Sequence, residues 1–325
     1  MTYGTWYSST HIRHAVAPAD VRTGLPLGPF VPARDAAIPR AAGNPVLLKG
    51  AGTTTTADGY RVLFTTNQEF APPVRNCSGR DPADWHREAV YNPGNPMGIN
   101  LAWSTSLDGP WTVRYDLLRG VALPYGLNSA TNPAVVQLAN GTVILAYKTW
   151  PTAAVCQRLI GSPQCKAIGI VSTHDHGWNG SYSHRPMGAG FVAVGGDVED
   201  PSIYQDPTSG ALHLLMHTAD GGGAGGSAHS ADLGKTWAFD VTKHAYDYSV
   251  RMAGPVGPQL RLSNREEPKL LLDWDGFPAA LINQATVRAL DGTDSPPPPG
   301  AGYSGPQSTY LTFTLMQPLL PPSPT

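Results

Sequence analysis

Apolar residues along this chain occur in short runs that glycine and proline interrupt. No stretch keeps the i, i+3, i+4, i+7 spacing of an amphipathic helix over more than about two turns without one of these residues. Pairs of apolar runs joined by tight turns recur instead, which is the signal of β-hairpins. The pattern therefore predicts an all-β protein with few helices.

Four of the hairpins share one plan, in which a polar or acidic residue precedes a proline and an apolar strand, a turn and a second strand follow. The residues before the prolines are Asn44, Asn132, Asp200 and Glu267, at spacings of 88, 68 and 67 residues. An insert at residues 67–98 accounts for the longer first spacing. A repeat of this length is typical of a β-propeller, because one blade cannot bury both faces until its neighbours stack on it.

A third apolar strand follows each of the first three hairpins and leads through a polar turn to a tryptophan. The last example, Ser230 to Trp237, fits the S-x-D-x-G-x-T-W pattern of the Asp box of sialidases and related propellers. In that motif the Asp caps a turn and the Trp packs between blades. We therefore expect this segment to stabilise a hairpin and not to take part in catalysis.

The repeats predict one β-propeller domain over residues 1–325. Residues 1–34 resemble the outer part of a repeat without its inner strands, so the first blade is expected to be incomplete at the N-terminus. Residues 35–320 supply the remaining blades, and the alternating segment "STYLTFTLMQPLL" near the end is expected to close the last one.

Composition narrows the choice of partner. Charged residues make up 14% of the chain and the net charge is −2, so there is no basic field for nucleic acid or anionic lipid. No apolar run approaches the roughly eighteen residues of a membrane span. We expect a neutral partner, no nucleic acid, no membrane and a monomeric protein.

Cysteines and glycosylation sequons indicate a compartment. The three cysteines lack CxxC spacing, so no metal site is predicted. Cys156 and Cys165 flank a short loop that a disulfide would staple, with free thiols as the alternative. Three Asn-x-Ser/Thr sequons also occur. Together these features predict a secreted protein whose signal peptide is missing from this sequence.

Four segments in order carry a family resemblance: "NPAVVQLANGTVILAYK", "EDPSIY", "GGSAHSADLGKTW" and "NREEPKLLLDWDGFPAALINQ". Over about residues 35–320 they resemble the five-bladed propeller glycoside hydrolases of the arabinanase, β-xylosidase and levansucrase type, which are family-43-like. The resemblance implies five blades whose innermost strands open on one central pocket. It implies an oligo- or polysaccharide substrate, a neutral glycan of the arabinofuranoside, xyloside or galactoside kind. No cofactor is predicted, although a central calcium ion is compatible with the resemblance.

Two carboxyl groups are the candidates for catalysis. Hydrolysis of a glycosidic bond needs one protonated carboxyl, which donates to the leaving oxygen, and one ionised carboxylate. Glu199, two residues before a proline, matches the general acid of the related hydrolases, and Glu266 matches the Glu of their RERP motif. A solvated Glu199 and a structural ion pair between Arg265 and Glu266 are the alternatives.

The remaining site candidates are polar residues at the mouths of the same strands. The predicted substrate-binding residues are Asn44, Asn132, Asp200, Arg265, Glu267 and His217. For His217, support of a central ion or water and simple packing are both open. Active relatives carry Asp where Asn44 and Asn132 stand, and asparagine cannot take a proton from water. The base therefore lies in the missing part of the first blade, or the site binds sugar without cleaving it.

Three functions remain after this comparison. The first is a glycoside hydrolase that acts on a neutral glycan by two-carboxylate chemistry in the central pocket. The second is a carbohydrate-binding pseudoenzyme that has lost the catalytic base. The third and least favoured is a sialidase-type propeller, which the Asp box suggests but which needs an arginine triad and a tyrosine nucleophile.

Overall fold

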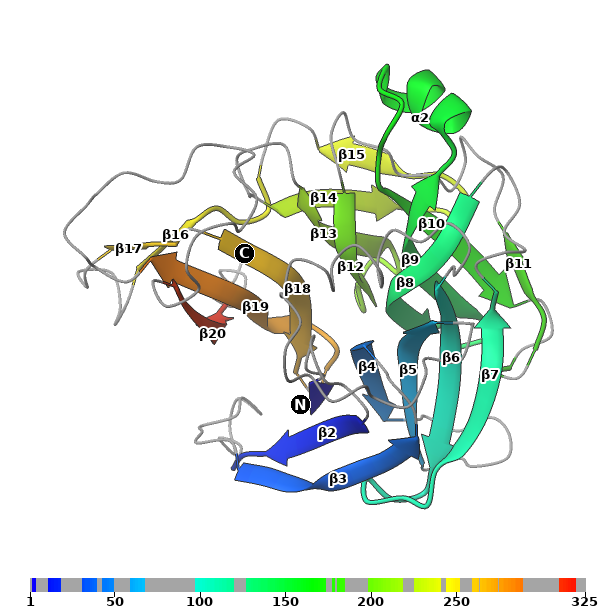
Figure 1. Cartoon of the computed structure of the whole chain (residues 1–325), viewed down its shortest axis with the longest axis vertical. Coiled ribbons are helices and arrows are strands. Elements are labelled where there is room, and N and C mark those ends of the chain that lie inside the picture. Colours follow the sequence, from blue (N-terminus) through cyan, green and yellow to red (C-terminus); the bar gives the residue numbers. More distant parts are fainter. Residues whose placement is uncertain are drawn as a thin grey trace, which may run out of the picture.

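A computed structural model of the chain shows sheets arranged around a ring, with the strands β4, β8, β12 and β18 nearest its middle (Figure 1). It describes residues 2–3, 11–18, 31–39, 43–49, 59–67, 97–119, 127–173, 177–178, 180–184, 198–218, 225–240, 244–251, 259–262, 264–273, 275–288 and 310–319. The predicted all-β class and the β-propeller are confirmed. The number of blades and the division at residues 34 and 35 stay predictions.

Three of the sheets have four strands each, and every strand pairs antiparallel with the next along the chain. The first comprises β4 (Gly43–Lys49), β5 (Tyr60–Asn67), β6 (Met97–Ser104) and β7 (Thr112–Leu118). The second comprises β8 (Leu127–Gln137), β9 (Val143–Pro151), β10 (Ala167–Thr173) and β11 (Tyr182–His184). The third comprises β12 (Val198–Gln205), β13 (Leu212–Thr218), β14 (Gly225–Ser230) and β15 (Ala238–Asp240).

The remaining described strands form smaller sheets. One contains β1 (Thr2–Tyr3), β2 (His11–Val16) and β3 (Val31–Pro39). Another contains β18 (Asn264–Leu272), β19 (Pro278–Arg288) and β20 (Tyr310–Pro318). A short hairpin joins β16 (Ser249–Arg251) and β17 (Gln259–Arg261). The four predicted hairpins are thus confirmed as β4–β5, β8–β9, β12–β13 and β18–β19, and the predicted closing strand as β20.

The hydrophobic core lies between neighbouring sheets. Along β13, Leu212, Leu214 and Met216 are fully buried and pack with apolar residues of β8, β9 and β10. Because side chains alternate along a strand, His213 and His217 project from the other face of β13. One face of this sheet therefore belongs to the core, and the other carries polar and aromatic groups.

A short helix, α2 (Ala153–Ile160), interrupts the β-structure between β9 and β10, where no helix was predicted. The helix ends at Gly161, which adopts a left-handed backbone (φ 69°) and donates its N–H to the carbonyl of Gln157. The disulfide between Cys156 and Cys165 is formed and ties the helix to the chain that enters β10. No helix in the described part of the chain is long and apolar enough to cross a membrane.

The Asp-box hairpin after β14 is a turn held by its own side chains. The buried Ser230 Oγ accepts a hydrogen bond from the N–H of Gly234 (2.7 Å), and Asp232 Oδ1 accepts one from the N–H of Thr236 (2.8 Å). Trp237 packs against the core between sheets. The predicted structural role is confirmed, so this hairpin gives the sialidase alternative no support.

Candidate active site

The repeated residue before each proline has the same unusual backbone in all four hairpins. Its φ is 48° in Asn44, 48° in Asn132, 54° in Asp200 and 51° in Glu267. The pairing register shifts at each of these positions, as it does at a β-bulge. A left-handed conformation outside glycine costs on the order of 1–3 kcal/mol and is often found at functional sites.

The side chains at three of these bulges form a hydrogen-bonded chain across the middle of the ring. Asn44 Nδ2 donates to Asn132 Oδ1 (2.6 Å), and Asn132 Nδ2 donates to Asp200 Oδ1. Lys269, two residues after Glu267, donates from Nζ to the carbonyl of Pro201 (3.2 Å). The predicted meeting of residues from separate repeats therefore takes place, and the chain of amides ends on a carboxylate.

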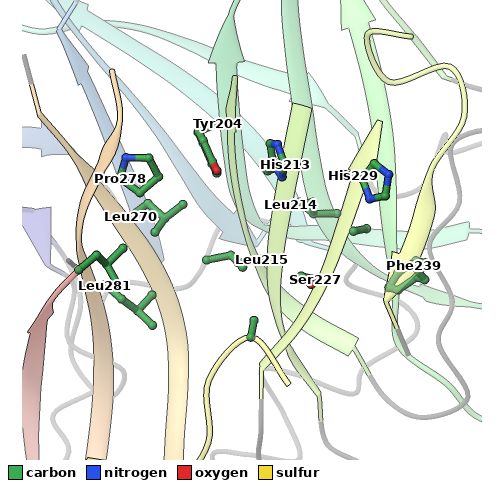
Figure 2. Close-up of a pocket in the computed structure, with 13 residues that line it drawn as sticks. Tyr204, His213, Leu214, Leu215, Ser227, His229, Phe239, Leu270, Pro278 and Leu281 are labelled. Carbon is green, nitrogen blue, oxygen red and sulfur yellow. The ribbon is translucent and has the colours of Figure 1, made fainter. Parts of the chain in front are cut away.

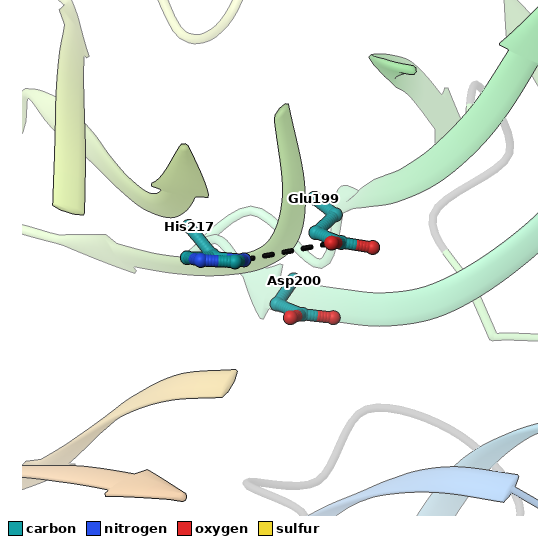
Figure 3. A group of neighbouring side chains, drawn as sticks. All are labelled: Glu199, Asp200 and His217. Carbon is teal, nitrogen blue, oxygen red and sulfur yellow. Dashed lines mark ion pairs between the residues drawn. The ribbon is translucent and has the colours of Figure 1, made fainter. Parts of the chain in front are cut away.

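Glu199 lies beside the bulge of β12 and contacts three basic side chains. Its carboxylate pairs with Lys148 of β9 and with Lys166 Nζ at 2.9 Å. It also lies 3.5 Å from His217 Nδ1, the pair drawn in Figure 3. Only 14% of the Glu199 side chain is exposed. The carboxylate is therefore enclosed by cations from its own sheet and from the neighbouring sheet.

These contacts decide the charge of Glu199. Burial by itself would raise the pKa of Glu199, but the contact with His217 and the charges of Lys148 and Lys166 hold that pKa well below its usual range. Burial would lower the pKa of His217, yet its contact with Glu199 and the nearby Asp200 raise that pKa overall. A general acid must carry a proton, so this environment argues against the predicted role of Glu199 as proton donor.

The two carboxyl groups on β18, Glu266 and Glu267, have raised pKa values, in contrast to Glu199. Burial, reinforced by the negative charge of Asp200, raises the pKa of Glu267 to about 7, although Lys269 opposes the shift. Burial also raises the pKa of Glu266, against a hydrogen bond of 2.5 Å from Asn264 Nδ2. The site thus combines an ionised carboxylate on β12 with carboxyl groups on β18 that retain protons to higher pH.

Arg265 is buried and hydrogen-bonded. It is only 1% exposed, and its guanidinium donates to Asn283 Oδ1, the carbonyl of Asp247 and Gln317 Oε1, each at 2.9 Å. These partners take its nitrogens in place of Glu266, so the alternative ion pair is not formed. These contacts give Arg265 a packing role, and its contact with a substrate stays a prediction.

Glu199, Asp200 and His217 also bring one potential metal ligand each within 4.8 Å of one another (Figure 3). Lys148 and Lys166 each contact one oxygen of Glu199, however, and a bound cation would have to displace or repel them. The residues present therefore do not fit a central calcium ion.

The sequence analysis did not identify three lysines of the site: Lys148, Lys166 and Lys269. A signal for Lys148 exists in the repeat itself. In β9 it pairs with Thr131, just as His217 in β13 pairs with Glu199. Comparison of the second strands of the hairpins, and not only of the first, would have placed Lys148 at the central site.

Known proteins match this chain in structure only. No protein-family model matches the sequence, and no curated protein matches it. A thermostable family-43 glycoside hydrolase superposes with a TM-score of 0.54 at 10% identity, over 99% of this chain and 93% of the other. The chain has the fold of the family-43 glycoside hydrolases.

Two further structures agree with this fold. The endo-arabinase of Bacteroides thetaiotaomicron gives a TM-score of 0.51 at 13% identity and covers 97% of this chain and 88% of its own. A xylan β-1,4-xylosidase of Bacillus halodurans gives 0.52 at 13% identity, over 98% of this chain and 49% of its own. The propeller that the sequence resemblance implied is thereby confirmed, and identities this low show the fold alone.

Proposed function

We propose that the chain is a glycoside hydrolase that acts on a neutral glycan at the centre of the propeller. The observation that carries the proposal is the contrast between two carboxyl groups of one site. Burial beside Asp200 raises the pKa of Glu267 to about 7. Against the effect of burial, the contact with His217 and the charges of two lysines hold the pKa of Glu199 well below its usual range. Environments that separate the pKa values of neighbouring carboxyl groups distinguish proton donors from carboxylates that remain charged.

In this proposal Glu267 is the general acid and Asp200 the general base. As the glycosidic C–O bond breaks, Glu267 gives its proton to the leaving oxygen. A water molecule forms the new bond to the anomeric carbon and passes a proton to Asp200, whose Oδ1 is oriented by Asn132. Exchange with solvent then restores both carboxyl groups, and one water molecule is consumed.

Glu199 has an electrostatic role in the same scheme. A carboxylate whose pKa is held far below neutrality is a poor base, because general bases work best when their pKa lies near the working pH. It remains negatively charged throughout and can stabilise the positive charge that develops on the sugar ring. Lys148 and Lys166 hold it in place.

The balance of charge supports a neutral substrate. Lys148 and Lys166 lie beside Glu199, and Lys269 lies beside Asp200 and Glu267. An acidic sugar would have to compete with these carboxylates for the lysines. A neutral sugar requires only hydrogen bonds, which Asn44 and other polar groups at the strand mouths can supply.

Variants in the carboxyl groups test the assignment. Turnover of 4-nitrophenyl arabinofuranoside, xyloside and galactoside is compared among the wild type, Glu267→Gln, Asp200→Asn and the matched control Glu266→Gln. We expect kcat to fall by about 10²- to 10⁴-fold in the first two variants and much less in the control. The opposite pattern, with Glu266→Gln inactive and Glu267→Gln active, would transfer the donor role to Glu266.

A carbohydrate-binding protein without hydrolytic activity is the second candidate. Asn44 and Asn132 favour it, because they occupy the centre of the ring with amides that bind hydroxyl groups but do not accept a proton from water. Saturable binding of arabino- or xylo-oligosaccharides with no turnover of any of the three aryl glycosides would support this candidate and contradict the first.

Secretion remains part of the proposal. The disulfide between Cys156 and Cys165 supports it, because such bonds persist mainly in oxidising compartments. Expression in a secreting host should give protein with this bond formed, as the intact mass before and after reduction would show.

A further inference from the structure

A cavity lies away from the central carboxyl groups, between the sheet β12–β15 and the sheet β18–β20. Its volume is about 540 Å³, within the range of small-molecule pockets. It opens on the face of β13 opposite the hydrophobic core, where His213 projects. None of the carboxyl groups of the central site lines it.

One wall of this cavity is a row of aromatic rings. Tyr204, His213 and His229 stand directly opposite one another on β12, β13 and β14. The rings of Tyr204 and His213 are stacked, with centroids 5.1 Å apart and planes 18° from parallel, and His229 follows at 6.4 Å. Figure 2 shows the rings of Tyr204 and His213 side by side.

The facing wall is aliphatic. Leu270, Pro278 and Leu281 lie across the cavity from the aromatic row (Figure 2). Polar side-chain atoms come from Tyr204, Ser227 and the two imidazoles, and no Asp, Glu, Asn, Gln, Lys or Arg is among the described residues that line the cavity. The cavity therefore offers two apolar surfaces and a few hydrogen-bonding groups.

We propose that this cavity binds a neutral phenolic compound. A flat aromatic ring fits between an aromatic wall and an aliphatic wall, and its hydroxyl group finds partners in Ser227 and the imidazoles. A sugar ring fits less well, because its several hydroxyl groups would be desolvated with too few partners.

The imidazole beside Tyr204 suits a neutral ligand. Burial lowers the pKa of His213, and the neighbouring His229 adds to this effect against the opposing charge of Asp206. A neutral imidazole can donate one hydrogen bond and accept another, which matches the donor and acceptor of a phenolic hydroxyl group.

The first test is titration calorimetry of the full chain with methyl 4-hydroxybenzoate. We expect saturable binding of one ligand per chain. Tyr204→Leu removes the stacking ring and should weaken the affinity by about two- to twelvefold, the range measured for aromatic pairs. The matched control is Tyr115→Leu, which changes an exposed tyrosine on β7 and should leave the affinity unchanged.

A second variant guards against a general loss of folding. Ser227→Leu fills the cavity and should abolish binding while thermal unfolding, followed by circular dichroism, stays cooperative. Binding should persist in Glu267→Gln, since the cavity does not depend on the central site. The proposal would be overturned if the wild type showed no saturable binding. It would also be overturned if Tyr204→Leu and Ser227→Leu both bound the phenol with the affinity of the wild type. Preference for methyl xyloside over the phenol would overturn the ligand class.

Discussion

Replacing Glu267 with glutamine should change how the stability of the protein depends on pH. The folded protein holds the pKa of this carboxyl at about 7, against an ordinary value of 4.5. Between these two values the folded state binds the proton more tightly than the unfolded state. The stabilising effect of the protonated group is therefore complete below about pH 4.5 and is lost as the pH rises to about 7.

The difference between the two pKa values corresponds to about 3 kcal/mol of unfolding free energy. Glutamine has nearly the same shape and no charge, so Glu267→Gln avoids the cost of the buried carboxylate. We subtract the unfolding free energy of the wild type from that of the variant at each pH. This difference should be larger at pH 8 than at pH 4.5 by up to about 3 kcal/mol. The figure is an upper bound because Lys269 loses its charged neighbour.

Urea unfolding of wild type and variant at pH 4.5, 6, 7 and 8 measures this effect. Asp275→Asn serves as the control, because it removes a carboxylate at an exposed position. Its free energy of unfolding should follow that of the wild type across the range. A difference between Glu267→Gln and wild type that is the same at pH 4.5 and pH 8 would refute the raised pKa.

Other features of the structure give further expectations. Removal of one cation by Lys166→Met should raise the pKa of Glu199, which carbon NMR of labelled glutamate would detect as a higher midpoint; an unchanged midpoint would argue against the ion pair. Ser230→Ala leaves a buried N–H without its acceptor and should lower the free energy of unfolding by about 1–3 kcal/mol in urea, and a loss below about 0.5 kcal/mol would mean that the turn does not depend on this hydroxyl. Reduction of the disulfide between Cys156 and Cys165 should cost roughly 2–3 kcal/mol for a loop of this length, so equal urea midpoints with and without reductant would contradict a stabilising role.

The fold could be predicted from the sequence because the same type of residue recurs at the same position of each hairpin. The first strand of four described sheets contains a bulge, and the Asn, Asp or Glu before the proline marks that position each time. The turn after Ser230 is set by neighbouring residues, so its motif predicted it well. The short helix α2 was missed because it spans only eight residues, too few for hydrophobic periodicity to reveal it.

The site was only partly accessible, because protonation depends on neighbours that are distant in sequence. The sequence brought Glu199 and Glu266 forward as carboxyl groups at strand mouths. It did not show that Lys148 of β9 and Lys166, just before β10, would contact Glu199. It also gave Glu267 only a binding role. The raised pKa of Glu267 arises from burial beside Asp200, which the sequence does not show. Residue identity located the carboxyl groups, and three-dimensional contacts decide their charge.

The most direct test of the central claim is the dependence of turnover on pH and leaving group in the wild type and Glu267→Gln. If Glu267 donates the proton, wild-type kcat falls as the pH rises through about 7. Glu267→Gln should then be strongly impaired on phenyl xyloside, whose leaving group needs a proton, and much less impaired on 2,4-dinitrophenyl xyloside, whose leaving group needs none. Wild-type turnover that is flat from pH 5 to 8, or a variant equally impaired with both leaving groups, would contradict the account.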